Sequence, residues 1–393
     1  MNLRRLILMC GFALGVACML CPNPTAGATA SDAYDLGADA LAVSRLINCT
    51  KEPAALAVSK GVHAGYCARL SGVSARFLKR FSQREKPLLT QVVPQDLDLP
   101  VVYPFGGGDL LTALGTYPNA KEITTLSLEV SGDVRAASRV KPEALEAALI
   151  QAGDNLRRLV AVEHSKTTNL SSMSHSPLPA EIVFSLYAIS LWGFETTGFR
   201  YFDIAPDGSL DYWNKSDLDK REAEANAAAA RGHLRSTFFP NIEVQFKRPG
   251  ETTTRVFRHI AADLSDERLK KDSRVLLHLR AKQKVLAMTK AASYLLWWGT
   301  FSMIRQCLAD TAVFMISDST GFAPGYAKAQ GFSQTTYGQF HGSFLHEANE
   351  YIAQSFIEMW RTQPQRPLPF RYGYPDRDGH GHMLVTKRET TKP

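Results

Sequence analysis

Beyond its first 30 residues, the sequence lacks an apolar run long enough to cross a membrane. Ile182–Phe194 is apolar but short, and the apolar stretch Val285–Ile304 is interrupted by Lys290. A spanning helix needs about 20 consecutive apolar residues. We therefore expect no transmembrane anchor in the chain once its N-terminal segment has been removed.

The N-terminal segment has the layout of a secretory signal peptide. Arg4-Arg5 gives a basic start, Leu6–Leu20 is almost entirely apolar, and the small residues Ala28 and Ala30 follow a Pro-rich break. This pattern predicts cleavage after Ala30 and a periplasmic or secreted protein. An uncleaved membrane anchor and a lipoprotein cleaved before Cys18 are the alternatives.

Cysteine is scarce, and three of the six cysteines lie within the predicted signal peptide. Cys49 and Cys67 flank a predicted helical hairpin, and in an oxidising compartment they are candidates for a disulfide. Two free thiols are the alternative. Cys307 lies in an apolar segment and is expected to be a buried small hydrophobic residue.

A concentrated basic surface for nucleic acid is also missing. The formal net charge is +7, and the basic residues are scattered along the chain. No stripe of Lys and Arg alternates with aromatic residues, so the sequence gives no support for nucleic-acid binding.

The pattern of apolar residues predicts a signal peptide (residues 1–30), a helical N-terminal segment (31–90) and an α/β domain (100–393), with a Pro-rich linker at Lys86–Pro100. Strand Val101–Phe105, a glycine turn, helix Asp109–Tyr117 and strand Glu122–Val130 read as the start of a Rossmann-like, mostly parallel sheet flanked by helices. The further elements that we expect are helices at Pro142–His164, Pro179–Trp192, Glu222–Leu234 and Tyr351–Arg361, a mostly helical stretch at Leu269–Asp310, hairpins at Phe199–Trp213 and Ile242–Ile260, and strands at Ala312–Ser317 and His382–Lys387.

The turn after the first strand, Gly106, Gly107, Gly108 and Asp109, has two interpretations. The glycines would let backbone N–H groups approach an anionic ligand at the start of the next helix. Alternatively, Asp109 caps that helix. The turn is neither a GxGxxG motif nor a P-loop. Glu129, at the end of the second strand, resembles the acid that binds a ribose, but no cofactor can be named.

A second candidate is the turn Asp318, Ser319, Thr320 and Gly321, which follows a buried strand. It is not an aspartic-protease loop, because Ser319 separates Asp318 from Thr-Gly and the motif has no second copy. Asp318 is either a functional carboxylate or the start of an Asx turn. If Asp109 and Asp318 lie close together, they could act as an acid and base pair.

The known catalytic motifs GxSxG and HExxH are absent. Near the C-terminus, Asp378, His380 and His382 are weak candidates for binding a divalent metal. The alternative is a solvated loop that binds nothing.

Several motifs resemble those of a family of uncharacterised exported bacterial proteins. That family has a Phe-Ser-Gly-Pro-Asp-like turn after an apolar strand and an Asp-Asp-Ser-Gly-like turn further on. The matching stretches here are FGGGD (Phe105–Asp109), TYPNA (Thr116–Ala120), SLEV (Ser127–Val130), KAASYLL (Lys290–Leu296), ISDSTGF (Ile316–Phe322), YGQF (Tyr337–Phe340) and PLPFRYGY (Pro367–Tyr374). Glycine replaces both Ser and Pro of the first motif, and one acid of the second is missing. The resemblance implies export and architecture, with no known activity.

Three functions therefore stay open. The first is an exported protein that binds a small polar ligand or a partner protein of the envelope at the carboxyl ends of the strands. The second is a hydrolase or transferase that uses Asp109 and Asp318. The third is a structural or assembly protein of the envelope without a small-molecule site.

Overall fold

The computed structural model describes residues 32–50, 56–162, 170–293, 295–342, 349–374 and 381–389, and the predicted signal peptide lies outside them. The fold is α/β, as predicted. The helices are α1 (Gly37–Asn48), α2 (Lys60–Arg80), α3 (Lys86–Val92), α4 (Leu110–Thr116), α5 (Pro142–Val162), α7 (Ala180–Leu191), α8 (Lys215–Ala229), α9 (Asp266–Lys271), α10 (Arg274–Ala281), α11 (Ser302–Thr311), α12 (Pro324–Ala329) and α13 (Glu350–Thr362).

The strands are β1 (Val101–Pro104), β2 (Glu122–Ser127), β3 (Glu195–Ile204), β4 (Leu210–Tyr212), β5 (Ile242–Lys247), β6 (Arg255–Ala261), β7 (Val285–Thr289), β8 (Ala312–Ser317), β9 (Phe332–Gly338) and β10 (His382–Arg388). They form one sheet in the order β4-β3-β5-β6-β2-β1-β7-β8-β10-β9.

This sheet is mixed, which corrects the prediction of a mostly parallel one. Only the pairings within β6-β2-β1-β7-β8 are parallel, and the strands on both sides of this block pair antiparallel. For the pairs β3-β4 and β5-β6, the physical reason is loop length. The short turns around Gly208 and Gly250 join β3 to β4 and β5 to β6, and so short a connection permits only antiparallel neighbours.

The parallel block contains a reversal of strand order between β1 and β7. Val101 of β1 is aligned with Ile123 of β2 on one side and with Leu286 of β7 on the other. The chain moves outward from β1 to β2 in one direction and from β7 to β8 in the other. Ligands of open α/β sheets often bind at such a switch point, beyond the carboxyl ends of the strands.

Strand β7 interrupts the stretch Leu269–Asp310, which was predicted as mostly helical without a strand inside it. All five residues of Val285–Thr289 are buried, since the strand lies in the middle of the sheet with both faces covered. A short, wholly apolar run has the same sequence appearance in a buried strand as in a buried helix. The hydrophobic pattern therefore could not distinguish the two.

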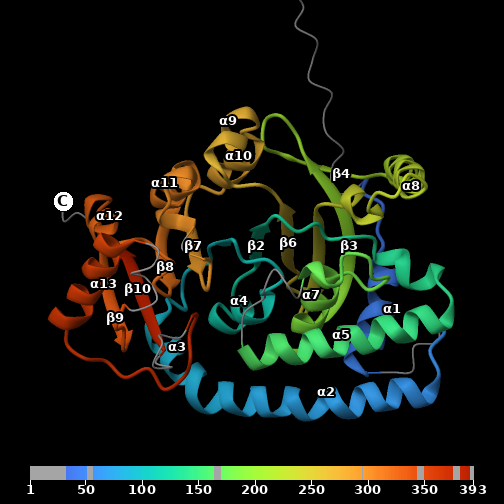
Figure 1. The fold of residues 1–393 in the computed structure, drawn as a ribbon, viewed down its shortest axis with the longest axis horizontal. Helices are drawn as coiled ribbons and strands as arrows, with labels where there is room; N and C mark the ends of the chain where they lie inside the picture. Colours follow the sequence, from blue (N-terminus) through green and yellow to red (C-terminus); the bar gives the residue numbers. More distant parts are fainter. Residues whose placement is uncertain are drawn as a thin grey trace, which may run out of the picture.

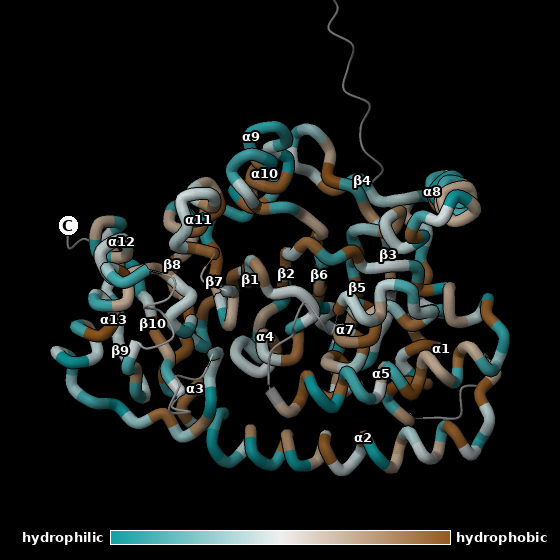
Figure 2. Tube along the Cα trace, in the orientation of Figure 1, coloured by the Kyte–Doolittle hydropathy of each residue, from teal (hydrophilic) through white to brown (hydrophobic). Residues whose placement is uncertain are grey.

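Two helical layers cover the sheet (Figure 1). Helices α1, α4, α5 and α7 share one hydrophobic core with one face of the sheet, and α2 packs outside α5. Helices α9 to α13 contribute to the core on the other face. Figure 2 shows the hydrophobic residues concentrated in the inner strands and α7, while α8 and α9 are largely hydrophilic.

The stretch predicted as a linker, Lys86–Pro100, begins instead with helix α3. A π-helical turn at Phe81–Glu85 joins α2 directly to α3, and Pro87 occupies the first turn of α3. Because proline has no N–H, Pro87 leaves one carbonyl of the preceding π-helical turn without its helical hydrogen bond. Leu89 and Val92 anchor α3 by packing into the core.

The predicted disulfide is present between Cys49, at the end of α1, and Cys67 of α2. Cys307 is buried and free, as predicted. Among the described residues, no helix is long and apolar enough to cross a membrane.

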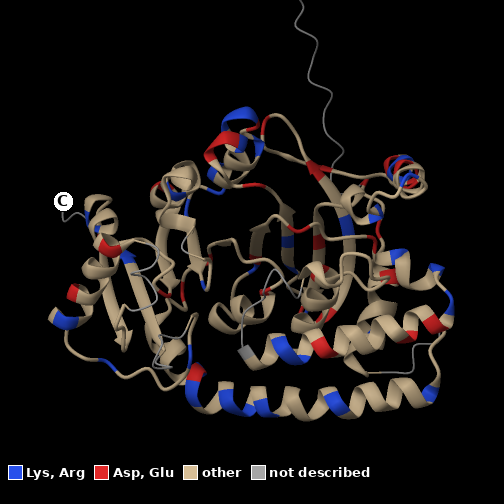
Figure 3. Cartoon of the chain, in the orientation of Figure 1, with Lys and Arg blue, Asp and Glu red and all other residues tan. Residues whose placement is uncertain are grey.

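The segment from Lys60 to Lys86 is strongly basic. It contains seven Lys and Arg residues and only one acidic residue, Glu85, which is buried. Figure 3 shows the basic residues distributed along α2, the outermost helix of its layer. The local excess of six positive charges nearly equals the net charge of +7 for the whole chain.

Candidate functional site

The loops that follow β1 and β7 meet at the switch point, and their backbone is strained. Phe105 after β1, and Ala291 and Ser293 after β7, all have positive φ angles, between 51° and 59°. This conformation is unfavourable for residues other than glycine, and it occurs frequently at functional sites. The strain makes this edge of the sheet the first place to look for a site.

Close packing explains the glycines of the Gly106–Asp109 turn. A Cβ atom at Gly106 would lie 2.7 Å from Cγ of Tyr103, and one at Gly108 would lie 2.7 Å from Cδ2 of Phe184. Gly107 has a φ of 48°. Each glycine therefore meets a steric or conformational need of the fold itself.

Asp109 is the N-cap of α4, which was one of the two predicted interpretations. Its carboxylate accepts hydrogen bonds from Thr112 N at 3.3 Å, Thr112 Oγ1 at 2.8 Å and Tyr103 Oη at 3.1 Å. Burial raises the pKa of Asp109 to about 6, although the positive charge of Lys290 opposes the rise. The carboxyl group is almost inaccessible, with an exposed fraction of 1%.

Asp318 is fully buried and ties three segments together. One carboxylate oxygen accepts from Thr320 N at 2.9 Å and from the Thr320 hydroxyl, which forms an Asx-type turn. The other accepts from Ala291 N at 3.0 Å and Tyr374 N at 3.1 Å. All four carboxylate oxygens of Asp109 and Asp318 thus accept hydrogen bonds from the protein.

The two aspartates belong to one buried cluster. Both carboxylates contribute to raising the pKa of Tyr103 and of Tyr372 far above the usual value, after the larger effect of burial. The predicted neighbours Ser319 and Thr320 are fully buried as well. The strand ends thus bring the predicted residues Asp109 and Asp318 into one neighbourhood.

His382, a predicted metal candidate, instead contacts this second turn. Its Nε2 atom lies 2.8 Å from Ser319 Oγ, and its ring packs against Phe340 and Trp360. Asp378 and His380 lie outside the described residues. Within the described chain, the one set with metal-ligand spacing is Cys49, His63 and Cys67, whose two sulfur atoms form the disulfide.

Glu129 lies close to two residues that the sequence analysis did not single out, Glu181 and His259. The Nε2–H of His259 donates to Glu129 O at 2.8 Å, and Thr125 Oγ1 lies 3.1 Å from His259 Nδ1. The main-chain acceptor fixes the proton on Nε2, and burial lowers the pKa of His259 to about 4. The imidazole is therefore neutral at pH 7.

Glu181, in the first turn of α7, is the most anomalous polar residue described. It is 1% exposed, and neither carboxyl oxygen has a hydrogen-bond partner among the described residues. Its Oε2 lies 3.6 Å from His259 Nδ1 and 3.4 Å from the position of a Cβ atom at Gly108. Burial, and secondarily the charge of Glu129, raises the pKa of Glu181 well above its usual value. A buried unsatisfied carboxyl group is rare in folded proteins.

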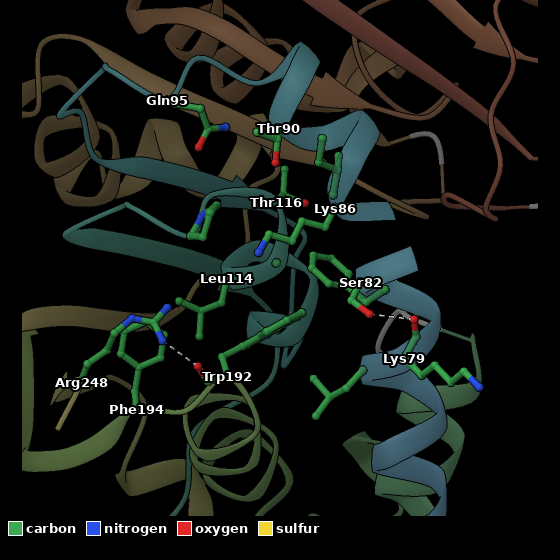
Figure 4. Close-up of a pocket in the computed structure, with 15 residues that line it drawn as sticks. Lys79, Ser82, Lys86, Thr90, Gln95, Leu114, Thr116, Trp192, Phe194 and Arg248 are labelled. Carbon is green, nitrogen blue, oxygen red and sulfur yellow. Dashed lines mark hydrogen bonds between the residues drawn. The ribbon is translucent and has the colours of Figure 1, made fainter. Parts of the chain in front are cut away.

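A mainly apolar cavity of the described chain lies away from the strand ends. We call it the α3–α4 pocket, and its volume is about 480 Å³. Its apolar wall comes from the end of α2, the π-helical turn, α3, α4 and the loop after α7, through Leu78, Phe81, Leu89, Leu114, Trp192 and Phe194 (Figure 4). Sequence analysis missed this pocket because its apolar wall comes from three stretches that are far apart in the sequence, Leu78–Leu89, Leu114 and Trp192–Phe194.

Two cationic groups face the α3–α4 pocket. Figure 4 shows the Lys86 ammonium directed toward the pocket near Leu114 and Thr116, whereas the Lys79 ammonium points away from it. Arg248 stacks over the ring of Phe194, 4.3 Å from its centroid, and donates to Trp192 O at 3.3 Å. No acidic side chain lines the described part of the pocket.

The inner wall of the pocket carries an unsatisfied hydroxyl group. Thr116 is 1% exposed, and its Oγ1 atom has no hydrogen-bond partner among the described residues. Behind this wall, a cavity of about 10 Å³ is lined by Thr116, Thr112, Lys290 and Tyr372. That is roughly the space one water molecule needs. Thr116 therefore lies between the pocket and the buried residues around Asp109.

Comparisons with known proteins identify no relative. No family, no curated protein and no solved structure matches the chain. The family resemblance therefore stays a prediction.

Proposed function

We propose that this protein binds a small, largely apolar molecule in the α3–α4 pocket. The observation that carries the proposal is the pocket itself. Its volume of about 480 Å³ is within the range of roughly 300–1,000 Å³ that is typical of small-molecule sites. Its lining is mainly apolar and aromatic, with a few polar groups at defined positions, which is also typical of such sites.

The Gly106–Asp109 turn, in contrast to the α3–α4 pocket, has no free space for a ligand among the described residues. At Gly106–Asp109 the glycines pack against Tyr103 and Phe184, and the Asp109 carboxylate is occupied by hydrogen bonds. A small polar ligand there would have to displace these contacts. The α3–α4 pocket offers space without rearrangement.

Export to the periplasm or beyond belongs to the same proposal. It rests on the basic, apolar and small-residue pattern of residues 1–30 and is supported by the disulfide between Cys49 and Cys67. Disulfides persist in oxidising compartments and are rare in the cytosol.

Binding of N-phenyl-1-naphthylamine, a neutral apolar fluorophore, tests the proposal. The wild-type protein should enhance its fluorescence with saturation at one site. Thr90→Trp should abolish the enhancement, because Thr90 is an exposed residue of α3 that lines the pocket. Gln91→Trp is the matched control, since Gln91 is exposed on the same helix but does not line the pocket.

The outcome separates the functions that the sequence left open. Saturable binding that Thr90→Trp removes and Gln91→Trp retains supports a ligand-binding protein. Weak, unsaturable binding that is equal in all three proteins would refute the proposal and favour a structural or assembly protein.

An enzyme that uses Asp109 and Asp318 is the second candidate. The observation in its favour is that Asp109 and Asp318 lie in one buried cluster. Burial there raises the pKa of Asp109 to about 6, which suits it to proton transfer near neutral pH. A screen with hydrolase substrates would support it if Asp109→Asn lost turnover while its fluorophore binding stayed intact. Equal activity of both proteins would refute it.

A further inference from the structure

We propose that the natural ligand of the α3–α4 pocket is a single-chain amphiphile with an anionic head group, whose charge is held by Lys86. This inference rests on the proposed function and adds the chemical class of the ligand. A free fatty acid and an anionic lipid with one acyl chain share this chemistry, a single hydrocarbon chain joined to a negative charge.

Lys86 places a positive charge at the rim of the apolar pocket. Lys86 is exposed and forms no ion pair among the described residues, and its ammonium is directed toward the pocket (Figure 4). A cation at the rim of an apolar wall attracts a ligand that is both apolar and anionic. A purely apolar ligand would leave this charge unused.

The other cation of the pocket, Arg248, is already held by its neighbours. Its guanidinium is held over Phe194 and by Trp192 O, and Glu251 lies 3.7 Å from its Nε atom. Arg248 is therefore already fixed as part of the wall, and part of its charge is balanced. Lys86 is left as the flexible cation that can reach a head group.

The basic segment from Lys60 to Lys86 adds a positive electrostatic field around the pocket. The pocket opens beside the segment from Lys60 to Lys86, which carries seven of the basic residues and a single buried acid. Such a concentration of one sign raises the local concentration of anions and speeds their association. The α2 surface thus favours the delivery of anionic amphiphiles over neutral or cationic ones.

The hydroxyl-bearing residue Thr116 lies on the inner wall of the pocket. It lines the pocket, is buried, and has no hydrogen-bond partner in the described chain, so a head group that displaces its cover gains a hydrogen bond. A carboxylate or phosphate oxygen near the Lys86 ammonium could accept that bond. Both groups would then act on the same end of the ligand.

Displacement of N-phenyl-1-naphthylamine from the full chain, produced in a bacterial host that can process its N-terminus, tests this inference. The competitors are decanoate, decanol and a lysophosphatidylglycerol with a ten-carbon chain, each below its micelle concentration. Decanoate should compete roughly fivefold or more better than decanol, because the Lys86 ion pair and the field of the basic segment both act on its charge. Lys86→Gln should weaken decanoate by roughly fivefold, the upper size of a solvent-exposed ion pair, and leave decanol unchanged.

Lys79→Gln is the matched control. It removes the same charge from a residue that lines the same pocket but whose ammonium points away (Figure 4). A loss confined to Lys86→Gln supports a specific head-group contact. Equal losses in both variants would mean that only the general field acts, and would overturn the assignment of the head group to Lys86.

The remaining outcomes are also decisive. Better competition by decanoate than by the lysolipid identifies a free acid as the source, and the reverse identifies a lipid. Equal competition by decanoate and decanol overturns the inference but leaves the proposed function standing, because a neutral ligand still binds. Failure of the fluorophore itself to bind would refute the proposed function instead.

Discussion

Replacing Glu181 with glutamine should change how the stability of this protein depends on pH. Glu181 is 1% exposed, its two carboxyl oxygens lack hydrogen-bond partners among the described residues, and its pKa is raised well above the usual value by burial. The folded protein therefore holds a proton on Glu181 at pH values where the unfolded chain has already released it. Each such proton links folding to pH.

The sign follows from the direction of this shift. Because the folded pKa lies above the unfolded value of about 4.5, the free energy of unfolding falls as pH rises above 4.5, until the folded pKa is reached. One proton corresponds to a slope of at most about 1.4 kcal/mol per pH unit. Glutamine has the same shape and does not titrate, so Glu181→Gln removes this slope.

His259 acts in the opposite direction, and the comparison removes its contribution. Its pKa is lowered to about 4, so the stability that comes from its neutral form is lost as pH falls from about 6.5 toward 4. That loss occurs in the wild type and in the variant alike. The difference between the two proteins therefore reports Glu181.

Urea unfolding at half-unit steps from pH 4.5 to 8 measures this difference. Glu181→Gln should gain stability relative to the wild type as pH rises, by up to about 1.4 kcal/mol per unit. Glu143→Gln, an exposed position at the start of α5, serves as the matched substitution. Parallel curves for wild type and Glu181→Gln would refute the raised pKa. If the glutamine variant fails to fold, Glu181→Met gives the same comparison without a polar group.

Two further predictions concern stability. Replacing Cys49 and Cys67 by serine should lower the free energy of unfolding by about 3 kcal/mol, because the disulfide closes a loop with a sequence separation of 18; unchanged urea midpoints in oxidising buffer would contradict this. Gly108→Ala should destabilise by about 1–3 kcal/mol, because its Cβ would lie 2.7 Å from Phe184 Cδ2. Gly61→Ala, on α2 with no atom within 4 Å of the added Cβ, should be neutral or slightly stabilising; a similar loss in both variants would refute the packing argument.

Local chemistry explains the features that the sequence predicted correctly. Strand β1, the Asp109 cap and the two hairpin turns each depend on a few neighbouring residues. An aspartate before an apolar helix satisfies an exposed backbone N–H whatever the rest of the fold does. The disulfide was predictable because the predicted compartment and the small number of cysteines restrict the choice of partners.

Tertiary context explains the features that the sequence did not predict. The central position of β7 depends on which strands flank it, and its apolar run does not distinguish a strand from a helix. The mixed sheet follows from combining hairpins with crossover connections. The prediction of a Rossmann-like sheet was based on the first unit, β1-α4-β2, whose two strands are parallel. It did not hold for strands joined by short turns, such as β3 and β4, which pair antiparallel.

The buried polar residues, in and near the candidate site, were even less predictable, because burial gives them their chemistry. Glu181 looks like an ordinary acid in the first turn of a helix, a position that favours negative charge. Only the packing of Phe184 and Gly108 around it shows that water and hydrogen-bond donors are excluded. The same holds for Thr116, whose unsatisfied hydroxyl is evident only once α4 is covered by Phe81 and Trp192.

The π-helical turn connects these observations, since it shapes the wall of the pocket. Between α2 and α3 the helix has one wider, π-helical turn at Phe81–Glu85. The ring of Phe81 packs edge-on against Trp192, with ring centroids 4.5 Å apart. A Cβ atom at Gly115 would lie 2.9 Å from Trp192 and 3.0 Å from Phe81, so the glycine allows both rings to approach α4. π-Helical turns are rare and occur often at functional sites. A regular α-helix through Phe81–Glu85 would rotate Lys86 and Leu89 around the helix axis relative to α2. The turn therefore sets the direction from which the Lys86 ammonium meets the apolar wall.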